Sequence, residues 1–527
     1  MKKYLYGASV QGIQGFIFET KKLREIAGAS QLVDNISSID WDNKKELSEF
    51  EKYCQPFHKV NRDNIVMSAA GNIKYKVEDD KILKQIVKGF PKYIANYAPG
   101  ITISQAVVEI KDSDDIQKSI DELEDKLKAQ RNIVSMPIDT GFMGLERARR
   151  NGGVAFYKDG DDYQDRGMFL KTPLKDKHSD NHWLNENKKL TDNDTLKLFK
   201  KFSQFDVNAH DVPFDLNELT KKKDNNSWIA IIHADGNGLG KVLTNMSNNV
   251  IAENREKAFI EFSKSLDKAT ISAAQRAFKE TIPQLKGKET YPIRPVVLGG
   301  DDLTVIIRAD LAYDFTKAYL IAFEEETSKE FESLKKYDKD IKGLTACAGI
   351  AYIKDSYPFH YGVRLAESLV GEAKKISKSD EIAIKVDKNV IPSSLAFYKV
   401  QSSFTEDLKE MKERTHFAKA SDINFDYGPY FIDDIQGFAN VKELDDKLAA
   451  LKKFSNDKSK GISKLRQYIS ELYKDKSKAE FLMNRISKIN KGFYKDLKLE
   501  SEREKDTMIL NDLIQLHTFK IAYDEKN

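Results

Sequence analysis

The sequence predicts an α+β fold, in which two tandem ferredoxin-like units are joined by a connector and followed by a C-terminal helical domain. Three observations predict it. Short apolar strand patterns lead into Gly-punctuated turns and helices, segments near the N-terminus have counterparts in the same order further along, and apolar residues after about residue 390 fall at helical spacing. The predicted domains are residues 1–130, 131–226, 227–389 and 390–527.

The two units are an internal repeat made of three pairs of matching segments. The first pair is a strand that runs into a turn and a helix, the second is a strand–turn–strand hairpin, and the third is a strand that leads into a charged helix. Each copy therefore has the order β-α-(α)-β-β-α-β, which is the ferredoxin-like arrangement. The pairs are Tyr4–Ile17 with Trp228–Leu243, Asn64–Lys74 with Pro295–Ile306, and Gly100–Ser113 with Gly343–Ser356.

The remaining two segments differ from the repeat in composition. Residues 137–226 are polar and rich in turn formers, with weak strand signals, so we expect a connector with partial order. Beyond residue 390, LKEMKERTHFAK, VKELDDKLAALKKF, ISKLRQYISELY and MILNDLIQLHTF all have helical periodicity. These stretches predict a helical bundle.

Bulk composition excludes several classes of protein. The sequence has no run of about 18 apolar residues and no apolar N-terminal stretch of signal-peptide length, which indicates a cytoplasmic protein without a membrane span. Its two cysteines, Cys54 and Cys347, argue against a disulfide framework and against cysteine-ligated zinc. A net charge of +3 does not mark a nucleic-acid binder.

Three aspartates of the second copy form a candidate catalytic site. Asp235 ends the strand IAIIHAD, and Asp301 and Asp302 lie at the tip of a hairpin whose turn begins with Gly299 and Gly300. In a ferredoxin-like sheet the first strand and this hairpin are neighbours, so the three carboxylates would repel one another unless cations lie between them. Carboxylate ligands suit Mg²⁺ or Mn²⁺, and two such ions can support chemistry on nucleoside triphosphates.

The glycines beside these acids have physical roles of their own. Gly299 and Gly300 permit the turn and let a base or ribose approach the backbone. Gly236 opens a segment whose free amide groups at a helix start can bind phosphate. The spacing from Asp235 to Lys241 fits neither a P-loop nor a dinucleotide-binding turn.

The first copy has the pattern without the acids. Gln11 is aligned with the position of Asp235, and the hairpin at residues 69–72 contains no acidic pair. We expect this degenerate copy to pack against the second copy or to supply a second nucleotide pocket.

These motifs resemble the large palm-domain subunit of type III CRISPR systems, the family that makes cyclic oligoadenylates, and more distantly the GGDEF diguanylate cyclases. The resemblance covers residues 1–130 and 227–400 and is weak elsewhere. It rests on GASVQGIQGFIFETKKLREIAGASQLV, HADGNGLGK, LGGDDL, AGIAYIKDSYPFHYGVRLAESLVGEAKK and SSLAFYKV.

The resemblance implies a role for each candidate residue. The metal ligands and catalytic residues of this chain would be Asp235, Asp301 and Asp302. The nucleotide pocket would include Gly236, Gly299 and Gly300, with Lys374 on the triphosphate and Lys241 and Arg294 as further phosphate contacts.

The resemblance also implies a function: a nucleotidyltransferase that joins nucleoside triphosphates, with ATP preferred, into a cyclic di- or oligonucleotide as an antiviral signal. The alternative is a non-catalytic or partner-activated scaffold subunit that binds RNA and CRISPR proteins. A homo-oligomer is compatible with the first function. A diguanylate cyclase fits less well, since the fourth motif residue is Asp302 rather than glutamate. Because the sequence opens on the first palm domain rather than on the HD nuclease domain common in the family, DNA cleavage is not expected.

Overall fold

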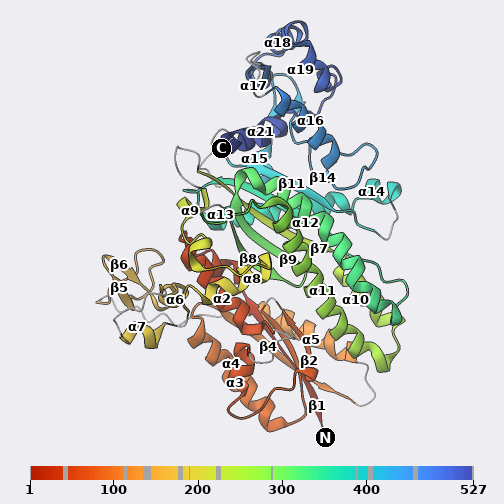
Figure 1. The fold of residues 1–527 in the computed structure, drawn as a ribbon. Coiled ribbons are helices and arrows are strands. Elements are labelled where there is room, and N and C mark those ends of the chain that lie inside the picture. The colour runs from red at the N-terminus through yellow and green to blue at the C-terminus, as the bar shows by residue number, and fades with distance from the viewer. Residues whose placement is uncertain are drawn as a thin grey trace.

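The computed structural model contains a four-stranded sheet in the N-terminal part and a six-stranded sheet in the centre, with helices of the C-terminal part beyond it (Figure 1). Ala70 of the first hairpin and parts of the predicted connector lie outside the described residues. The structure describes residues 2–39, 46–69, 71–111, 116–133, 144–175, 182–188, 190–220, 227–285, 289–386, 390–401, 407–454 and 461–524.

The central sheet has the strand order β14-β11-β10-β7-β9-β8. Its core of β7 to β10 is antiparallel, and β11 is added parallel to β10. The strands are β7 (Trp228–Asn237), β8 (Ile293–Gly299), β9 (Asp302–Arg308), β10 (Thr345–Lys354), β11 (Ser394–Lys399) and β14 (Tyr430–Phe431). The helices between them are α10 (Leu239–Asn249), α11 (Ala252–Thr281), α12 (Ala309–Glu330), α13 (Phe359–Ser377) and α14 (Asp380–Lys385).

Strand β7 shows why the helices divide between the two faces of this sheet. Ala230, Ile232 and Ala234 belong to a core that includes α11 and α12. Ile229 and Ile231 point the other way, into a core with α13 and the first copy. Since side chains alternate along a strand, Asp235 lies on the face of Ile229 and Ile231.

The first copy repeats this topology with the order β2-β3-β1-β4, which corresponds to β8-β9-β7-β10 in the second. Its helix α5 covers one face, while α2 and α4 cover the other. The predicted pair of ferredoxin-like units is therefore confirmed. The elements are β1 (Lys3–Gln11), α1 (Ile13–Ile17), α2 (Leu23–Ser37), α3 (Glu49–Cys54), η1 (Arg62–Asn64), β2 (Ile65–Ala69), β3 (Asn72–Val77), α4 (Asp80–Tyr97), β4 (Thr102–Ile110) and α5 (Ile116–Arg131).

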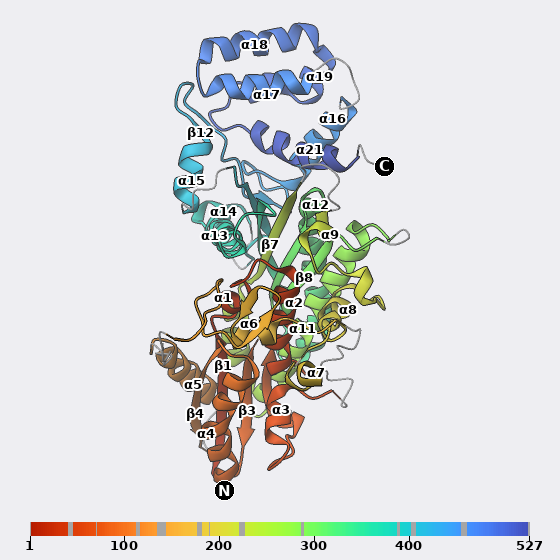
Figure 2. The same cartoon turned by 90° about the vertical axis from the view of Figure 1, so that its left-hand side faces the viewer.

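Helix α2 joins the two copies. It lies beside β8 in Figure 2, and the Ser30 hydroxyl donates a hydrogen bond to the carbonyl of Val296. Leu32 and Ile36 of α2 share one buried core with Ile231 and Ile306 of the second sheet. The two copies therefore pack through a continuous hydrophobic core.

The predicted connector folds into short elements that pack on both copies. Helix α6 contacts α2 so closely that a Cβ on Gly28 would lie 1.8 Å from the carbonyl oxygen of Lys171. Helix α8 lies against α11 and β8. The elements are β5 (Tyr157–Asp159), β6 (Asp162–Gln164), α6 (Arg166–Lys171), α7 (His182–Asn187), η2 (Asp194–Leu196), α8 (Lys197–Ser203), η3 (Ala209–Asp211) and α9 (Leu216–Thr220).

The C-terminal part is mainly helical, as the sequence predicts, and forms the end of the molecule opposite the first copy (Figure 2). Residues 394–399 and 430–431 differ from that expectation, because β11 and β14 extend the central sheet. The other elements of this part are α15 (Leu408–Thr415), β12 (Phe417–Ala418), β13 (Ile423–Asn424), α16 (Val441–Lys453), α17 (Gly461–Leu472), α18 (Lys476–Ile489), α19 (Lys491–Asp496), α20 (Leu499–Glu502) and α21 (Leu510–Asp524). In the second copy, η4 (Phe331–Lys336) lies between α12 and β10.

Among the described residues, no helix combines the length and apolar character that crossing a membrane would require.

Candidate active site

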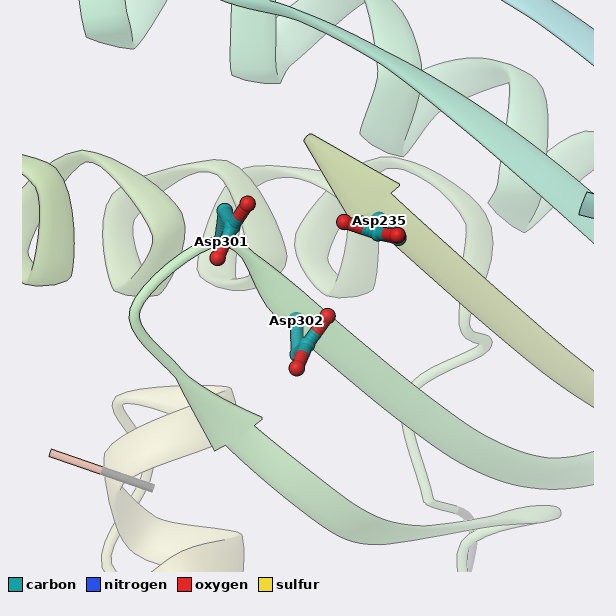
Figure 3. A group of neighbouring side chains, drawn as sticks. All are labelled: Asp235, Asp301 and Asp302. Atoms are coloured by element: carbon teal, nitrogen blue, oxygen red, sulfur yellow. The ribbon is translucent and has the colours of Figure 1, made fainter. Parts of the chain in front are cut away.

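Three carboxylates meet where β7 ends beside the β8–β9 hairpin (Figure 3). Asp235 is paired in register with Asp302, the first residue of β9, and Asp301 occupies the turn. One carboxylate oxygen from each of the three lies within 4.8 Å of the other two. The convergence expected from the sequence is therefore present, on partly exposed side chains open to a ligand.

The hairpin turn depends on its glycines. Gly299 pairs with Asp302, so Gly300 and Asp301 form the turn. Gly300 has a φ of +62°, in the left-handed region that side chains disfavour. A two-residue turn that needs this conformation at its first position favours glycine there.

Gly236 contributes through its lack of a side chain. A Cβ at this position would lie 2.8 Å from the Cβ of Asp301 and 2.9 Å from its Oδ2. Asp301 therefore uses the space over the backbone of β7 that any other residue would fill. The structure thus gives Gly236 a steric role beside the acids, in addition to the phosphate contact predicted for it.

The shared burial of the acids changes their proton affinity. Burial, followed by the charge of Asp235, raises the pKa of Asp301 to about 6. Burial, followed by the charges of Asp301 and Asp235, raises the pKa of Asp302 to about 7. Because the charged forms are destabilised by desolvation and by one another, this oxygen-only donor set fits divalent cations.

Lys374 of α13 is the cation that faces these acids. Its Nζ lies 2.6 Å from Oδ2 of Asp235 and donates a hydrogen bond to the carbonyl of Gly236. The lysine charge also lowers the pKa of Asp301 and Asp302 against the effect of burial. Lys374 is therefore within reach of any phosphate that binds at the acids.

Lys241 lines a cavity next to the acids and is not part of the acid group itself. The cavity has a volume of about 770 Å³ and begins at Asn237 and Gly238, where β7 ends. Five lysines, two aspartates (Asp338 and Asp340), hydroxyl groups and apolar side chains line it. Because the lysines outnumber the aspartates, the lining suits a ligand with an anionic part and an apolar part. Its lining includes Lys241, Lys335, Lys339, Lys342, Thr345, Ser377, Lys378 and Ile391.

Arg294 is not brought to this group. Its side chain is 2% exposed, its guanidinium donates to the carbonyl of Thr195, and it lies 4.9 Å from the ring centre of Phe214. Burial lowers its pKa to about 9. These contacts fasten β8 to the connector and argue against the predicted phosphate contact.

The equivalent place in the first copy has neutral side chains and one guanidinium. Strand register pairs Ser9 with Asn72 as it pairs Asp235 with Asp302, so Ser9 rather than Gln11 matches Asp235, and the alignment of Gln11 is wrong. The Ser9 hydroxyl donates to Asn72 at 2.7 Å and accepts from Arg131 at 3.1 Å. An arginine thus contacts the polar group that replaces the acids.

Sequence reasoning missed two residues near the acids. Glu367 of α13 raises the pKa of Asp302, and the three acids help to raise the pKa of the buried Tyr319 hydroxyl. Glu367 precedes Lys374 by seven residues, so helical periodicity could have found it. Nothing in the sequence distinguishes Tyr319 from an ordinary core tyrosine.

Comparisons with known proteins agree with this geometry. Residues 228–383 match the family model of the Cas10/Cmr2 second palm domain. The chain is also similar to the solved Csm1–Csm4 cassette in complex with pppApApA, with 13% sequence identity and a TM-score of 0.53; the match covers 99% of this chain and 69% of that one. It is similar as well to the Csm1–Csm4 cassette in complex with cA4, with 13% sequence identity and a TM-score of 0.50; that match covers 99% of this chain and 70% of the other. At this identity the likeness shows the fold. Among curated proteins, none matches this sequence.

Proposed function

Through its second palm domain this chain belongs to the Cas10/Cmr2 family of large palm-domain subunits of type III CRISPR systems, and we propose that it is a metal-dependent nucleotidyltransferase that makes a cyclic oligoadenylate from ATP. The observation that carries the proposal is the convergence of Asp235, Asp301 and Asp302 beside Lys374 and a ligand-sized cavity. The solved structures of this fold in complex with pppApApA and with cA4 support adenylate as substrate and product class.

Each side chain has a role in this reaction. Asp235, Asp301 and Asp302 would hold two Mg²⁺ or Mn²⁺ ions, which supply charge stabilisation for the attacking hydroxyl and the departing pyrophosphate. Lys374 exchanges its contact with Asp235 for a triphosphate oxygen, and Gly236, Gly299 and Gly300 leave room for the nucleotide against the backbone. Lys241 contributes positive charge to the adjoining cavity.

The chemical step is a nucleotidyl transfer. A ribose 2′- or 3′-hydroxyl of one nucleotide attacks the α-phosphorus of another, one P–O bond forms, and pyrophosphate leaves with the electrons of the bond that breaks. Preorganised positive charge at the triphosphate is the main source of stabilisation. A final intramolecular transfer closes the ring.

The test is to incubate the purified chain with each labelled nucleoside triphosphate and Mg²⁺ or Mn²⁺, and to resolve products by mass spectrometry. We expect a cyclic adenylate whose rate of formation falls by about 10²-fold or more in Asp301→Ala/Asp302→Ala. Asp433→Ala/Asp434→Ala is the matched control, because these adjacent aspartates are exposed and do not belong to the group of three acids. Equal rates in both double variants would contradict the proposal.

The Csm1–Csm4 neighbours are complexes of two proteins and favour a second function, that of a scaffold subunit held by a partner protein. The same preparation tests it. Absence of product from every triphosphate, together with co-purifying RNA or partner subunits in native mass spectrometry, would support the scaffold. The mass of the isolated chain would also show whether it forms a homo-oligomer.

A further inference from the structure

Helix α11 forms two hydrogen bonds with Gly300 of the active-site turn. The Thr270 hydroxyl donates a hydrogen bond to the carbonyl of Gly300, and the amide of Gly300 donates to Oδ1 of Asp267 at 3.4 Å. Asp267 and Thr270 are three residues apart and so share one face of the helix. Both backbone polar groups of this residue are therefore held by α11.

This arrangement matters because Gly300 has no regular strand geometry to fix it. Its φ is +62°, and it lies between the paired residues Gly299 and Asp302. Gly300 is partly buried, and side chains are the partners of both its backbone groups. Since Gly300 directly precedes Asp301 in the chain, the orientation of its peptide sets where the Asp301 carboxylate points.

The acceptor, Asp267, is itself connected to other parts of the molecule. Nζ of Lys201, on the connector helix α8, lies 3.7 Å from Oδ2 of Asp267. Asp34 and Ser68 of the first copy line a small polar cavity with Lys201, Asp267 and Gly299. Burial raises the pKa of Asp34 and the charge of Lys201 lowers it, so the lysine that pairs with Asp267 also interacts electrostatically with Asp34 across this cavity. The first copy, the connector and the second copy thus meet behind the turn.

Helix α11 also contacts the first copy near its N-terminus, whereas Asp267 and Thr270 lie in its middle. Lys76 of β3 forms an ion pair with Glu256 in the first two turns of α11. The ion pair at Glu256 and the turn contacts at Asp267 and Thr270 lie on the same continuous helix, Ala252–Thr281. The turn is therefore held by an element that contacts both copies.

We propose that Asp267 and Thr270 are positioning residues that orient the Gly300–Asp301 peptide, and that Lys201 and Asp34 link them to the first copy. The inference rests on the proposed function of the acid site. It assigns α11 a part in catalysis although Asp267 and Thr270 touch neither the acids nor the nucleotide cavity.

The test uses two pairs of variants of the full chain. Thr270→Val removes the hydroxyl and keeps the shape, whereas Thr270→Ser keeps the hydroxyl; Asp267→Ala removes the acceptor, whereas Asp267→Asn keeps one. Thr281→Val is the control, because Thr281 also lies on α11 and its hydroxyl bonds only to the carbonyl of Ala277 in its own helix.

The first measurement is amide hydrogen exchange at Gly300, read by NMR on ¹⁵N-glycine-labelled protein. We expect exchange to be about tenfold faster in Thr270→Val and Asp267→Ala, and near the original rate in Thr270→Ser, Asp267→Asn and Thr281→Val. Lys201→Met should give a smaller increase in the same direction. Unchanged exchange in Thr270→Val and Asp267→Ala would overturn the inference even if the chain makes no product.

The second measurement separates positioning from simple structural support. With product formation as the readout, we expect kcat to fall about tenfold in Thr270→Val with KM for ATP unchanged, and Thr270→Ser to restore it. If exchange rises but kcat stays constant, the contact does not position the acids and the inference fails while the proposed function stands. If neither the variants nor the unaltered chain make product, the proposed function fails. The exchange rates at Gly300 then decide whether Asp267 and Thr270 hold the Gly300–Asp301 peptide.

Discussion

Among single residues, Gly236 is the one most tightly fitted to the acids, because Asp301 occupies the volume that its Cβ would need. The sequence singled out this glycine for its backbone amide at a helix start. The structure adds a steric reason that no sequence pattern contains, since it depends on a turn more than 60 residues further along the chain.

Gly236→Ala should lower the rate of product formation by about tenfold or more, because the new methyl group pushes Asp301 away from Asp235 and Asp302. Gly240→Ala is the matched control, since its Cβ would meet nothing within 4 Å and alanine suits the first turn of α10. Rates are compared at saturating ATP, with circular dichroism to confirm folding. Equal rates for the two variants would refute the steric role.

The register between copies shows a limit of sequence reasoning at this scale. Gln11 and Ser9 are two residues apart, so both lie on the same face of β1 and the apolar alternation cannot choose between them. Strand pairing distinguishes the two residues, because Ser9 pairs with Asn72 as Asp235 pairs with Asp302.

At the scale of elements, the position of Lys374 depends on how closely α13 approaches β10. Gly349 of β10 makes this approach possible, because a Cβ there would lie 2.1 Å from the carbonyl oxygen of Ala366 on α13. A backbone atom cannot move aside as a flexible side chain can. Gly349 therefore permits the close approach of helix and sheet at which Lys374 reaches Asp235.

Gly349→Ala should destabilise the chain by about 1–3 kcal/mol, as overpacking does, and should also reduce activity through the displacement of Lys374. Gly371→Ala is the control within α13, because a Cβ at that position meets nothing within 4 Å. We expect it to leave stability unchanged or to raise it by up to about 1 kcal/mol. Chemical denaturation followed by circular dichroism measures the free energy of unfolding of both variants. A similar loss of stability in Gly349→Ala and Gly371→Ala would rule out the packing explanation.

The elements were predictable where periodicity and turn chemistry agree. Both ferredoxin-like copies, the acid hairpin and the C-terminal helices follow from strand and helix patterns. Arg294 could not be placed, because it lies five residues before Gly299 and about 17 Å along an extended strand from the turn. Strand β11 was not assigned to the sheet because its pairing with β10 joins segments separated by a long helix.

At the scale of the whole molecule, the clustering of acids at the site lowers the free energy of unfolding when the acids are ionised. Asp301 and Asp302 are held in a partly buried group where burial and mutual repulsion raise their pKa values to about 6 and about 7. The unfolded chain ionises aspartates near pH 4. Between these pH values the folded protein binds more protons than the unfolded chain.

The free energy of unfolding should therefore decrease, through these two groups, as pH rises from about 4 to about 7 in the absence of divalent ions. Asp301→Asn/Asp302→Asn should flatten this part of the profile. Adding Mn²⁺ at pH 7.5 should stabilise the unaltered chain, by about 2.7 kcal/mol at a hundredfold excess over Kd, and not the variant. Thermal unfolding across pH with and without Mn²⁺ checks this; a variant that responds to Mn²⁺ as the original does would contradict it.

The packing of α21 on the central sheet has a consequence for biosynthesis. Phe519 of α21 stacks on Tyr352 of β10, with ring centres 4.5 Å apart, and contacts Trp228 at the start of β7. Trp228 is translated about 290 residues before Phe519, an interval of roughly 15 to 60 s at ordinary ribosomal speeds. Until α21 emerges, aromatic side chains of the nascent sheet remain accessible to chaperones. A chain truncated before residue 510 would thus contain all three acids while its sheet lacks the cover of α21.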